Sequence, residues 1–267
     1  MINKAKQLQL SAAALVGGAV DVLSGRGWRY CACCRRRVLA FLPWRGGSAA
    51  APPLMQALDM IGSDLDHFAC PLCGSTDRER HLRLYLEETG MAATFAGKRV
   101  LHFAPERRLT PWIASLLPSE HLLADLYPED VAVRRLDLEQ MPFPDGYFDV
   151  VIANHVLEHV AHLDLAVMQI ARVLKVDGWA ILQVPWARTL ATTIEDPSVT
   201  SSAARRELYG QEDHVRLFGA DVFERIGRFG LSAEPVSHSE ALASISPVSA
   251  GVNVQEPFMR FRRRQQS

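Results

Sequence analysis

All five cysteines of the chain lie in its first third, and four of them form two C-x2-C pairs. Gly74 directly follows the second pair, where it permits the positive φ of a tight turn, whereas the first pair has no such glycine. Four thiolates carried by two tight turns are the soft ligands that tetrahedral zinc prefers. One pair alone could be a redox motif or plain buried cysteines, but two pairs favour a structural zinc site, with Cys33 as the spare thiol. The predicted ligands are Cys31, Cys34, Cys70 and Cys73.

His155, Glu158 and His159 form an H-x-x-E-H sequence, which matches the signature of inverted zinc proteases. We do not predict a protease, because that signature needs its own helix and a further metal ligand. Here the sequence is expected to open a helix that follows a strand. The plainer interpretation is a glutamate at a helix start, where its charge interacts with the positive end of the helix dipole.

Polar side chains also follow successive apolar segments of the chain. Asp125, Asp137 and Asn154 each stand at or just after the end of such a segment. A single aspartate in this position is more often part of a turn or a helix cap. Because the carboxyl ends of parallel strands meet at one edge of a sheet, the shared position favours one ligand crevice.

The elements that must position these residues alternate between strands and helices. We predict strands at 98–104, 121–127, 131–137, 147–154 and 179–185, with helices at 109–117 and 162–175 and a turn at Asp177–Gly178. Further helices are expected at 77–90 and 218–230, and closing strands at 231–238 and 253–261. This alternation predicts an α/β fold with a doubly wound, mostly parallel sheet.

The order of motifs from Lys98 onward resembles that of class I S-adenosylmethionine (SAM)-dependent methyltransferases. RVLHFAPE, LLADLY, RRLDLEQMPFPDGYFDVVIANHVLEHV and ARVLKVDGWAILQVP follow one another at the family's spacing. The chain looks most like the type 11 methyltransferase group, and within it a branch with an N-terminal CPxCG knuckle, a HFAPE motif and a late GQxDHVR motif. The late motif here is GQEDHVRLFG, residues 210–219, and the resemblance covers roughly residues 70–230.

The resemblance implies a Rossmann-like domain over residues 91–267, with a lid insertion near 186–217. Residues 1–90 would form an N-terminal helix and a small zinc-ribbon-like module. SAM would be the co-substrate. Asp125 would accept hydrogen bonds from its ribose hydroxyls and Asp137 would meet its adenine amino group, while Leu138 and Met141 pack on the ring faces. The full set of expected SAM-binding residues is Ala104, Glu106, Asp125, Leu126, Asp137, Leu138 and Asn154.

The loop after the first strand departs from the family's D-x-G-x-G pattern. It has His102, Ala104 and Glu106 at those positions, and a glutamate is no substitute for glycine. Either the site is degenerate, or the Glu106 carboxylate faces the positive charge of SAM. The second interpretation is favoured because a carboxylate beside a cation is stabilising in a partly dry cleft.

Methyl transfer asks mainly for alignment of the acceptor, the methyl carbon and the sulfur. A hydroxyl acceptor would also need a base, for which His214 is the first candidate and His155 the second. Asp213 is expected to orient His214, and Arg216 to hold an anionic group. A histidine that merely packs in the lid is an equally good account of His214.

Composition limits the partners of the chain. The net charge of −1 and the absence of a basic stripe disfavour a nucleic-acid binder, so we expect a small or medium-sized acceptor. The apolar run after Lys6 only faintly resembles a signal peptide, and clustered cysteines fit the cytoplasm, so no membrane association is expected. Two alternatives stay open: an RNA methyltransferase that docks through Arg35, Arg36 and Arg37, and a binding protein that kept the fold without turnover.

Overall fold

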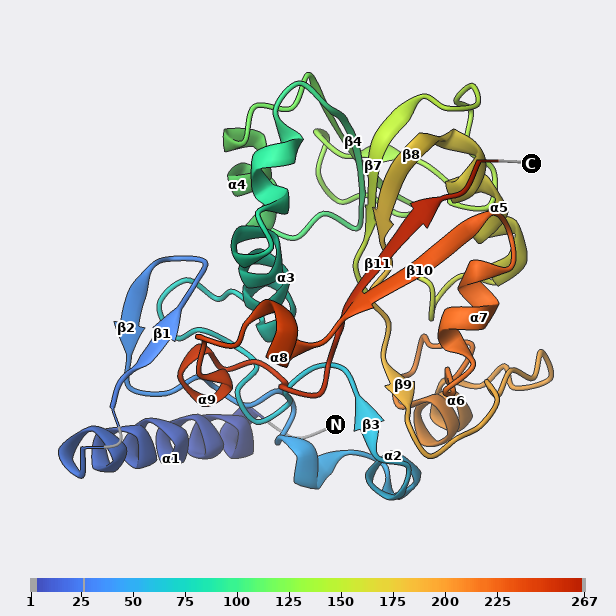
Figure 1. Cartoon of the computed structure of the whole chain (residues 1–267). Helices are drawn as coiled ribbons and strands as arrows, with labels where there is room; N and C mark the ends of the chain where they lie inside the picture. Colours follow the sequence, from blue (N-terminus) through green and yellow to red (C-terminus); the bar gives the residue numbers. More distant parts are fainter. Residues whose placement is uncertain (1–3, 26, 266–267) are drawn as a thin grey trace.

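The structure is a computed structural model that describes residues 4–25 and 27–265. A seven-stranded sheet in the order β10-β11-β8-β7-β4-β5-β6 runs through its centre (Figure 1). The strands are β4 (Arg99–Phe103), β5 (Glu120–Asp125), β6 (Arg134–Arg135), β7 (Phe148–Ala153), β8 (Leu174–Ile181), β10 (Leu231–Val236) and β11 (Phe258–Arg263).

The five strands from β4 to β8 are parallel, while β11 pairs antiparallel with both β8 and β10. The chain winds outward from β4 in both directions, since β4 pairs with β5 on one side and β7 on the other. The gap between the ends of β4 and β7 is therefore the switch point where such sheets bind ligands. The predicted mostly parallel, doubly wound sheet is confirmed.

Two details of the strand prediction are wrong. The strand expected at 131–137 is only two residues long, Arg134–Arg135. The turn expected at Asp177–Gly178 lies inside β8, where Asp177 has φ 63° and the register against β7 shifts. Lys175, Val176 and Asp177 therefore form an irregular start of β8 rather than a separate connection.

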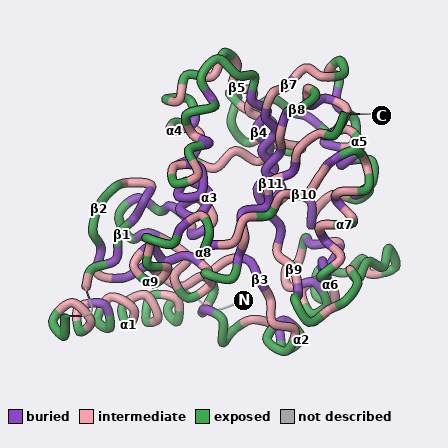
Figure 2. Tube along the Cα trace, viewed as in Figure 1, coloured by how far each residue is buried: buried purple, intermediate pink, exposed green. Residues whose placement is uncertain are grey.

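Helices cover both faces of the sheet. On one face α3 (Asp77–Glu88) and α4 (Leu109–Ser115) pack on Val100, Val150 and Ile152, and on the other α5 (Leu163–Val173) and α7 (Val222–Gly227) pack on the alternate residues. The alternation follows from the period of two along a strand, since successive side chains point to opposite faces. Figure 2 shows the central strands as the most continuously buried part of the chain.

The first part of the chain, which precedes β4, forms one long helix and several short elements beside the sheet, in addition to α3 (Figure 1). They are α1 (Lys4–Leu23), β1 (Arg29–Cys31), β2 (Arg36–Val38), a 3-10 turn at Ser48–Ala50, α2 (Pro53–Ala57), β3 (Met60–Ile61) and a second 3-10 turn at Met91–Phe95. The expected N-terminal helix is present and spans 20 residues. Within the described ranges, no helix combines the length and the apolar character needed to cross a membrane.

The segment after β8 leaves the sheet and turns toward the first part of the chain. Its elements are β9 (Trp186–Ala187) and α6 (Ser202–Tyr209), and β9 pairs antiparallel with β3. Between β10 and β11 the chain forms α8 (His238–Ala241) and α9 (Pro247–Ala250), of which α9 lies beside β1 in Figure 1. Three parts of the chain that are distant in sequence thus meet beyond one end of the sheet.

Candidate functional site

The four paired cysteines converge in the first part of the chain. Their sulfur atoms all lie within 4.8 Å of one another, and three of the four side chains are buried. Cys33 does not belong to this cluster. The convergence of two C-x2-C turns gives four sulfurs the spacing at which one tetrahedral ion can be held.

The two cysteine turns have the same backbone form. In one turn the Gly74 amide donates to the Cys70 carbonyl at 2.9 Å, and in the other the Arg35 amide donates to the Cys31 carbonyl at 2.8 Å. Gly74 has φ 73° and Arg35 has φ 56°, so both occupy the left-handed region. An arginine therefore takes the conformation that glycine adopts more easily, which explains how a pair without a following glycine forms the turn.

In the loop after β4, at the switch point, a residue other than glycine has a left-handed backbone conformation. Ala104 has φ 45°, and its amide donates to the Ala124 carbonyl of β5 at 2.8 Å. A residue with a Cβ adopts this conformation at a cost of roughly 1–2 kcal/mol. The backbone turn that a glycine would make is thus present in the HFAPE loop.

Glu106 bridges the ends of β4 and β7. One carboxylate oxygen accepts a hydrogen bond from His102 Nε2 at 2.7 Å and the other from Asn154 Nδ2 at 2.6 Å. Burial alone would raise the pKa of Glu106, but the hydrogen bonds from His102 and Asn154 outweigh it and hold the pKa below its usual value. Glu106 is therefore an ionised carboxylate at the point where the strand order reverses.

The other expected SAM-binding residues lie at the ends of β5 and β6. Asp125 accepts a hydrogen bond from the Tyr127 amide and Asp137 from the Glu139 amide, both at 2.8 Å, so each aspartate shapes its own turn. Leu126 is 42% exposed, whereas Leu138 is buried in the core. The expectation that Leu138 and Met141 line an open adenine slot is not met in this structure, because both are packed among core side chains.

The segment from His155 to His159 is a series of turns, so the expectation that it opens a helix is wrong. The next helix, α5, begins only at Leu163, which removes the helix-dipole explanation of Glu158. His155 has φ 56° and is buried, with Nδ1 3.4 Å from Glu158 and Nε2 3.5 Å from Glu256. This enclosure favours a structural role for His155 over that of a catalytic base.

His81 and Glu256 complete a buried polar network that the sequence did not reveal. His81 Nδ1 lies 3.0 Å from Glu256 Oε2, and the Tyr85 hydroxyl donates to the Glu256 carbonyl at 2.6 Å. His81 and Glu256 are 175 positions apart in the sequence, and no local motif connects them. Only the return of the chain between β10 and β11 to the start of α3 brings them together.

The late GQEDHVR motif places its residues differently from the prediction. His214 is buried and its Nδ1 contacts the Tyr209 carbonyl at 2.9 Å, while Asp213 is exposed and lies 3.3 Å from His159 Nδ1. Asp213 therefore orients His159 rather than His214. The histidine rings of residues 159 and 214 meet edge to face, with centroids 4.7 Å apart.

Arg216 does not face an open anion site as expected. Its guanidinium donates to the carbonyls of Leu157 and Val160 at 2.6 Å each, and pairs with Glu195 at 2.7 Å. The side chain is fully buried. These contacts fasten the turn after β7 to the lid segment, so Arg216 is a structural clamp in this conformation.

A cavity of about 580 Å³ opens beyond the carboxyl end of β8. Its walls come from the first part of the chain, the lid segment and the stretch before β11, and include Ile61, His67, Pro185, Tyr209 and His214. Asp64 lies 2.9 Å from His67 Nδ1, and this hydrogen bond raises the pKa of His67. The cavity thus combines apolar walls with a few charged groups, as small-molecule sites do.

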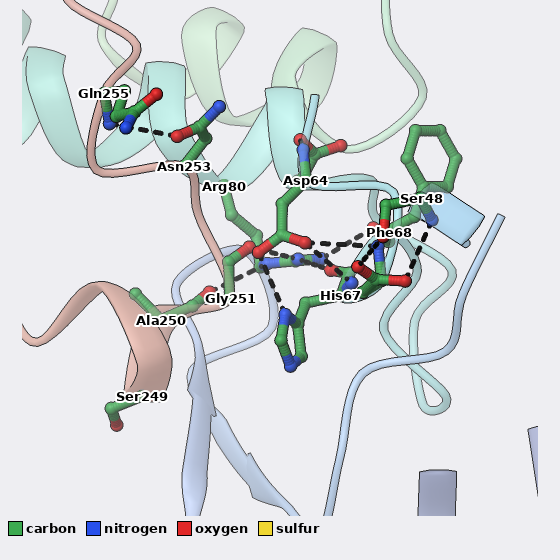
Figure 3. Close-up of polar contacts among 12 residues, drawn as sticks. Ser48, Asp64, His67, Phe68, Arg80, Ser249, Ala250, Gly251, Asn253 and Gln255 are labelled. Atoms are coloured by element: carbon green, nitrogen blue, oxygen red, sulfur yellow. Dashed lines mark hydrogen bonds and ion pairs between the residues drawn. The ribbon is translucent and has the colours of Figure 1, made fainter. Parts of the chain in front are cut away.

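Arg80 fastens one wall of this cavity. Its guanidinium donates to the carbonyls of His67, Phe68, Ala250 and Gly251 (Figure 3) and to that of Ser75, at 2.5 to 3.1 Å. An arginine side chain has five N–H donors, and each finds a carbonyl here. The cysteine-bearing loops and the stretch before β11 are therefore held together through one buried side chain.

Residues 92–182 match the family model described as Methyltransferase domain. The chain is 48% identical over 42 residues to the ubiquinone/menaquinone biosynthesis C-methyltransferase UbiE of Paraburkholderia xenovorans (strain LB400), which is 16% of this chain and 17% of that enzyme. It is 31% identical over 88 residues to the uncharacterized methyltransferase YcgJ of Bacillus subtilis (strain 168), 33% of this chain and 32% of that protein. The chain thus aligns with about a third or less of the length of these relatives.

Among solved structures, the crystal structure of the YcgJ protein from Bacillus subtilis is similar to this chain, with a TM-score of 0.44 and 18% identity. That similarity covers 67% of this chain and 98% of the other. The sequence match and the five parallel strands of the sheet, β4 to β8, fall on the same part of the chain. Residues 92–182 are therefore similar in sequence to a methyltransferase domain.

Proposed function

We propose that the chain catalyses SAM-dependent methyl transfer to a small acceptor. The observation that carries the proposal is the methyltransferase-domain match of residues 92–182, which coincides with a parallel sheet whose switch point lies between β4 and β7. Ligands of open α/β sheets bind at that point. A cavity of suitable size for a second small molecule opens nearby, beyond the carboxyl end of β8.

SAM would bind along the ends of β4, β5 and β7. The left-handed Ala104 supports this placement because the backbone loop keeps its turn without glycine. Glu106 and Asn154 would border the amino-acid end of SAM, where an ionised carboxylate attracts its positive charge. Asp125, Leu126 and Asp137 would meet the nucleoside, with Leu138 packing beneath them.

The acceptor would occupy the cavity that the lid segment borders. His214 reaches the cavity wall, and Asp64 and His67 supply charged groups for orientation. In this proposal the protein chiefly aligns the acceptor with the methyl group and excludes water. Arg216 and His155 contribute by holding the lid and the turn after β7 in place.

The four-cysteine cluster would hold a structural zinc ion in a zinc-ribbon-like module, in a protein of the cytoplasm. The sulfur spacing and the two matching turns support zinc, which thiolates bind in a closed tetrahedral site. The proposed division of the chain is 1–90 for this module and 91–267 for the methyltransferase domain. Helix α3 of the first part packs on the sheet of the second, so the two would act as one unit.

The test is thermal denaturation of the full chain with SAM and with its demethylated product. A ligand that binds only the folded state at a hundred times its Kd should stabilise it by about 2.7 kcal/mol. A rise in Tm with both nucleosides supports the proposal, whereas no shift with either contradicts it. RNA binding that weakens steeply with salt would instead favour a nucleic-acid acceptor.

A further inference from the structure

Glu158, His159 and His214 bring a second set of metal-ligating atoms together, apart from the four cysteines. One ligand atom of each residue lies within 4.8 Å of those of the other two. Glu158 and His159 belong to the turn after β7, and His214 follows α6 in the lid. We propose that these three side chains bind a divalent transition metal such as Zn²⁺ or Co²⁺.

The strongest sign is a buried carboxylate without a hydrogen bond. Glu158 is fully buried, and among the described residues neither of its side-chain oxygens accepts a hydrogen bond. The nearest cationic group that the structure records is His155, whose Nδ1 lies 3.4 Å from Oε1 without making a hydrogen bond. Burying an ionised carboxylate is costly unless it is paired or coordinates a metal. A divalent cation would supply the missing compensation.

The histidines are oriented as metal ligands usually are. His214 Nδ1 contacts the Tyr209 carbonyl at 2.9 Å, and because a carbonyl only accepts, Nδ1 carries the hydrogen and Nε2 the lone pair. That Nε2 is buried and has no hydrogen-bond partner in the described chain. His159 Nδ1 lies 3.3 Å from Asp213 Oδ2, which leaves its Nε2 to ligate. Histidines that bind metals typically donate their other N–H to a carbonyl or a carboxylate, as His214 does to Tyr209.

Two histidines and one glutamate suit borderline divalent metals better than Mg²⁺ or Ca²⁺, which prefer oxygen ligands alone. Three protein ligands also leave a coordination position for water or substrate, unlike the closed four-cysteine site. Since His214 lines the cavity, the acceptor would be one that offers an oxygen ligand, such as a hydroxyl or carboxylate. This choice of acceptor rests on the proposed methyl transfer, whereas the metal site itself does not.

The site can be tested by titrating the metal-stripped full chain with Co²⁺ and recording its absorption spectrum. Cobalt bound by thiolates gives intense charge-transfer bands, and cobalt bound by His and Glu does not. The wild type should bind two equivalents, of which only one is accompanied by thiolate bands. Glu158→Gln and His214→Ala should each bind only the thiolate equivalent, whose retention shows that the cysteine module is still folded.

A matched control is Glu139→Gln, since Glu139 also lies beside a histidine, 2.7 Å from His162 Nδ1, but belongs to no such cluster. It should keep both equivalents. Asp213→Asn changes only an exposed side chain that holds His159, and should weaken the second site about 10- to 100-fold. This variant keeps the test open if the buried substitutions do not fold.

The proposal is overturned if the wild type binds no cobalt beyond the thiolate-bound fraction, or if Glu158→Gln and His214→Ala keep the second equivalent. In either case Glu158 is neutralised by protonated histidines instead. Binding of S-adenosylhomocysteine, measured by calorimetry on the same samples, separates this result from the proposed function. A chain that binds two metals and no nucleoside has the metal site and lacks the proposed activity.

Discussion

Glu106 offers the sharpest test of how a loop without glycine could serve a methyltransferase. The substitution Glu106→Gln keeps the size of the side chain and removes its charge. In the structure the two carboxylate oxygens accept from His102 at 2.7 Å and from Asn154 at 2.6 Å. A glutamine amide can accept at only one of these places; if its oxygen accepts from Asn154, its NH₂ group can donate to His102 Nε2 only in the tautomer that leaves this nitrogen unprotonated.

Two effects of this substitution can be separated because they change different measured quantities, the stability of the apo protein and its affinity for SAM. Loss of a hydrogen bond to a charged group costs about 1.5–3 kcal/mol, so the apo protein should be less stable by that order. If Glu106 also meets the positive charge of SAM, SAM binding should weaken by roughly ten- to a hundredfold, because each 1.4 kcal/mol is a factor of ten. The second effect would be measured by calorimetry at a temperature where both proteins are folded.

A matched control for Glu106→Gln is Glu234→Gln. Glu234 is also a carboxylate with two side-chain partners, Arg260 at 2.7 Å and Arg262 at 2.9 Å, but it lies on the edge strand β10. It should leave SAM binding unchanged. Glu106→Gly should not restore binding, since the lost interaction is electrostatic. If Glu106→Gly binds SAM more tightly than the wild type, Glu106 obstructs the site and the reasoning is refuted.

Three further predictions follow from single side chains. Asp125→Ala should weaken SAM binding by about 1.5–3 kcal/mol. Asp130→Ala is the control, because it also loses a 2.8 Å hydrogen bond from the amide two residues on, and it should leave SAM binding unchanged. Equal effects of the two substitutions in calorimetry would contradict the role of Asp125. Cys70→Ser should abolish the proposed zinc content, measured by elemental analysis, while Cys33→Ser leaves about one ion per chain; a zinc-free wild type with freely titratable thiols would refute this. Burial and the charge of a neighbouring histidine lower the pKa of His121 from 6.5 to about 4. The fold therefore has the full stability that goes with neutral His121 above pH 6.5, and it loses this stability as the pH falls toward 4. Between pH 6.5 and pH 4 the midpoint of denaturation should change less in His121→Gln than in the wild type. An equal change in both proteins would show that His121 is not the cause of the pH dependence.

The fold was predictable where a local pattern determines the element. Buried runs such as those at β4 and β7 and the amphipathic helix α5 lie close to their expected positions, because periodicity reports which faces are covered. The errors fall where tertiary contacts decide. The sequence predicts that residues 155–159 open a helix. In the structure they form turns, held by the ion pair between His155 and Glu158 and by the hydrogen bond from Arg216 to the Leu157 carbonyl.

The candidate site was predictable only in part. The expected similarity to a methyltransferase domain is found over residues 92–182, and the four cysteines do meet, because both follow from motifs with strong spacing rules. The individual site residues stay predictions. Which histidine Asp213 orients, or whether Arg216 faces a cavity, depends on how the lid folds back on the turn after β7, and no spacing in the sequence encodes that.

The first part of the chain is better understood as a wall of the acceptor cavity than as an appendage. Arg80 joins the carbonyls of Phe68 and Ser75, which flank the second cysteine pair, to those of Ala250 and Gly251. The residues directly after Gly251 line the cavity. Because a buried guanidinium with all its donors satisfied is costly to release, a change in the cysteine loops should be transmitted to the cavity rather than absorbed locally. Metal removal should therefore impair acceptor binding more than SAM binding, whose expected residues lie on the strands of the sheet.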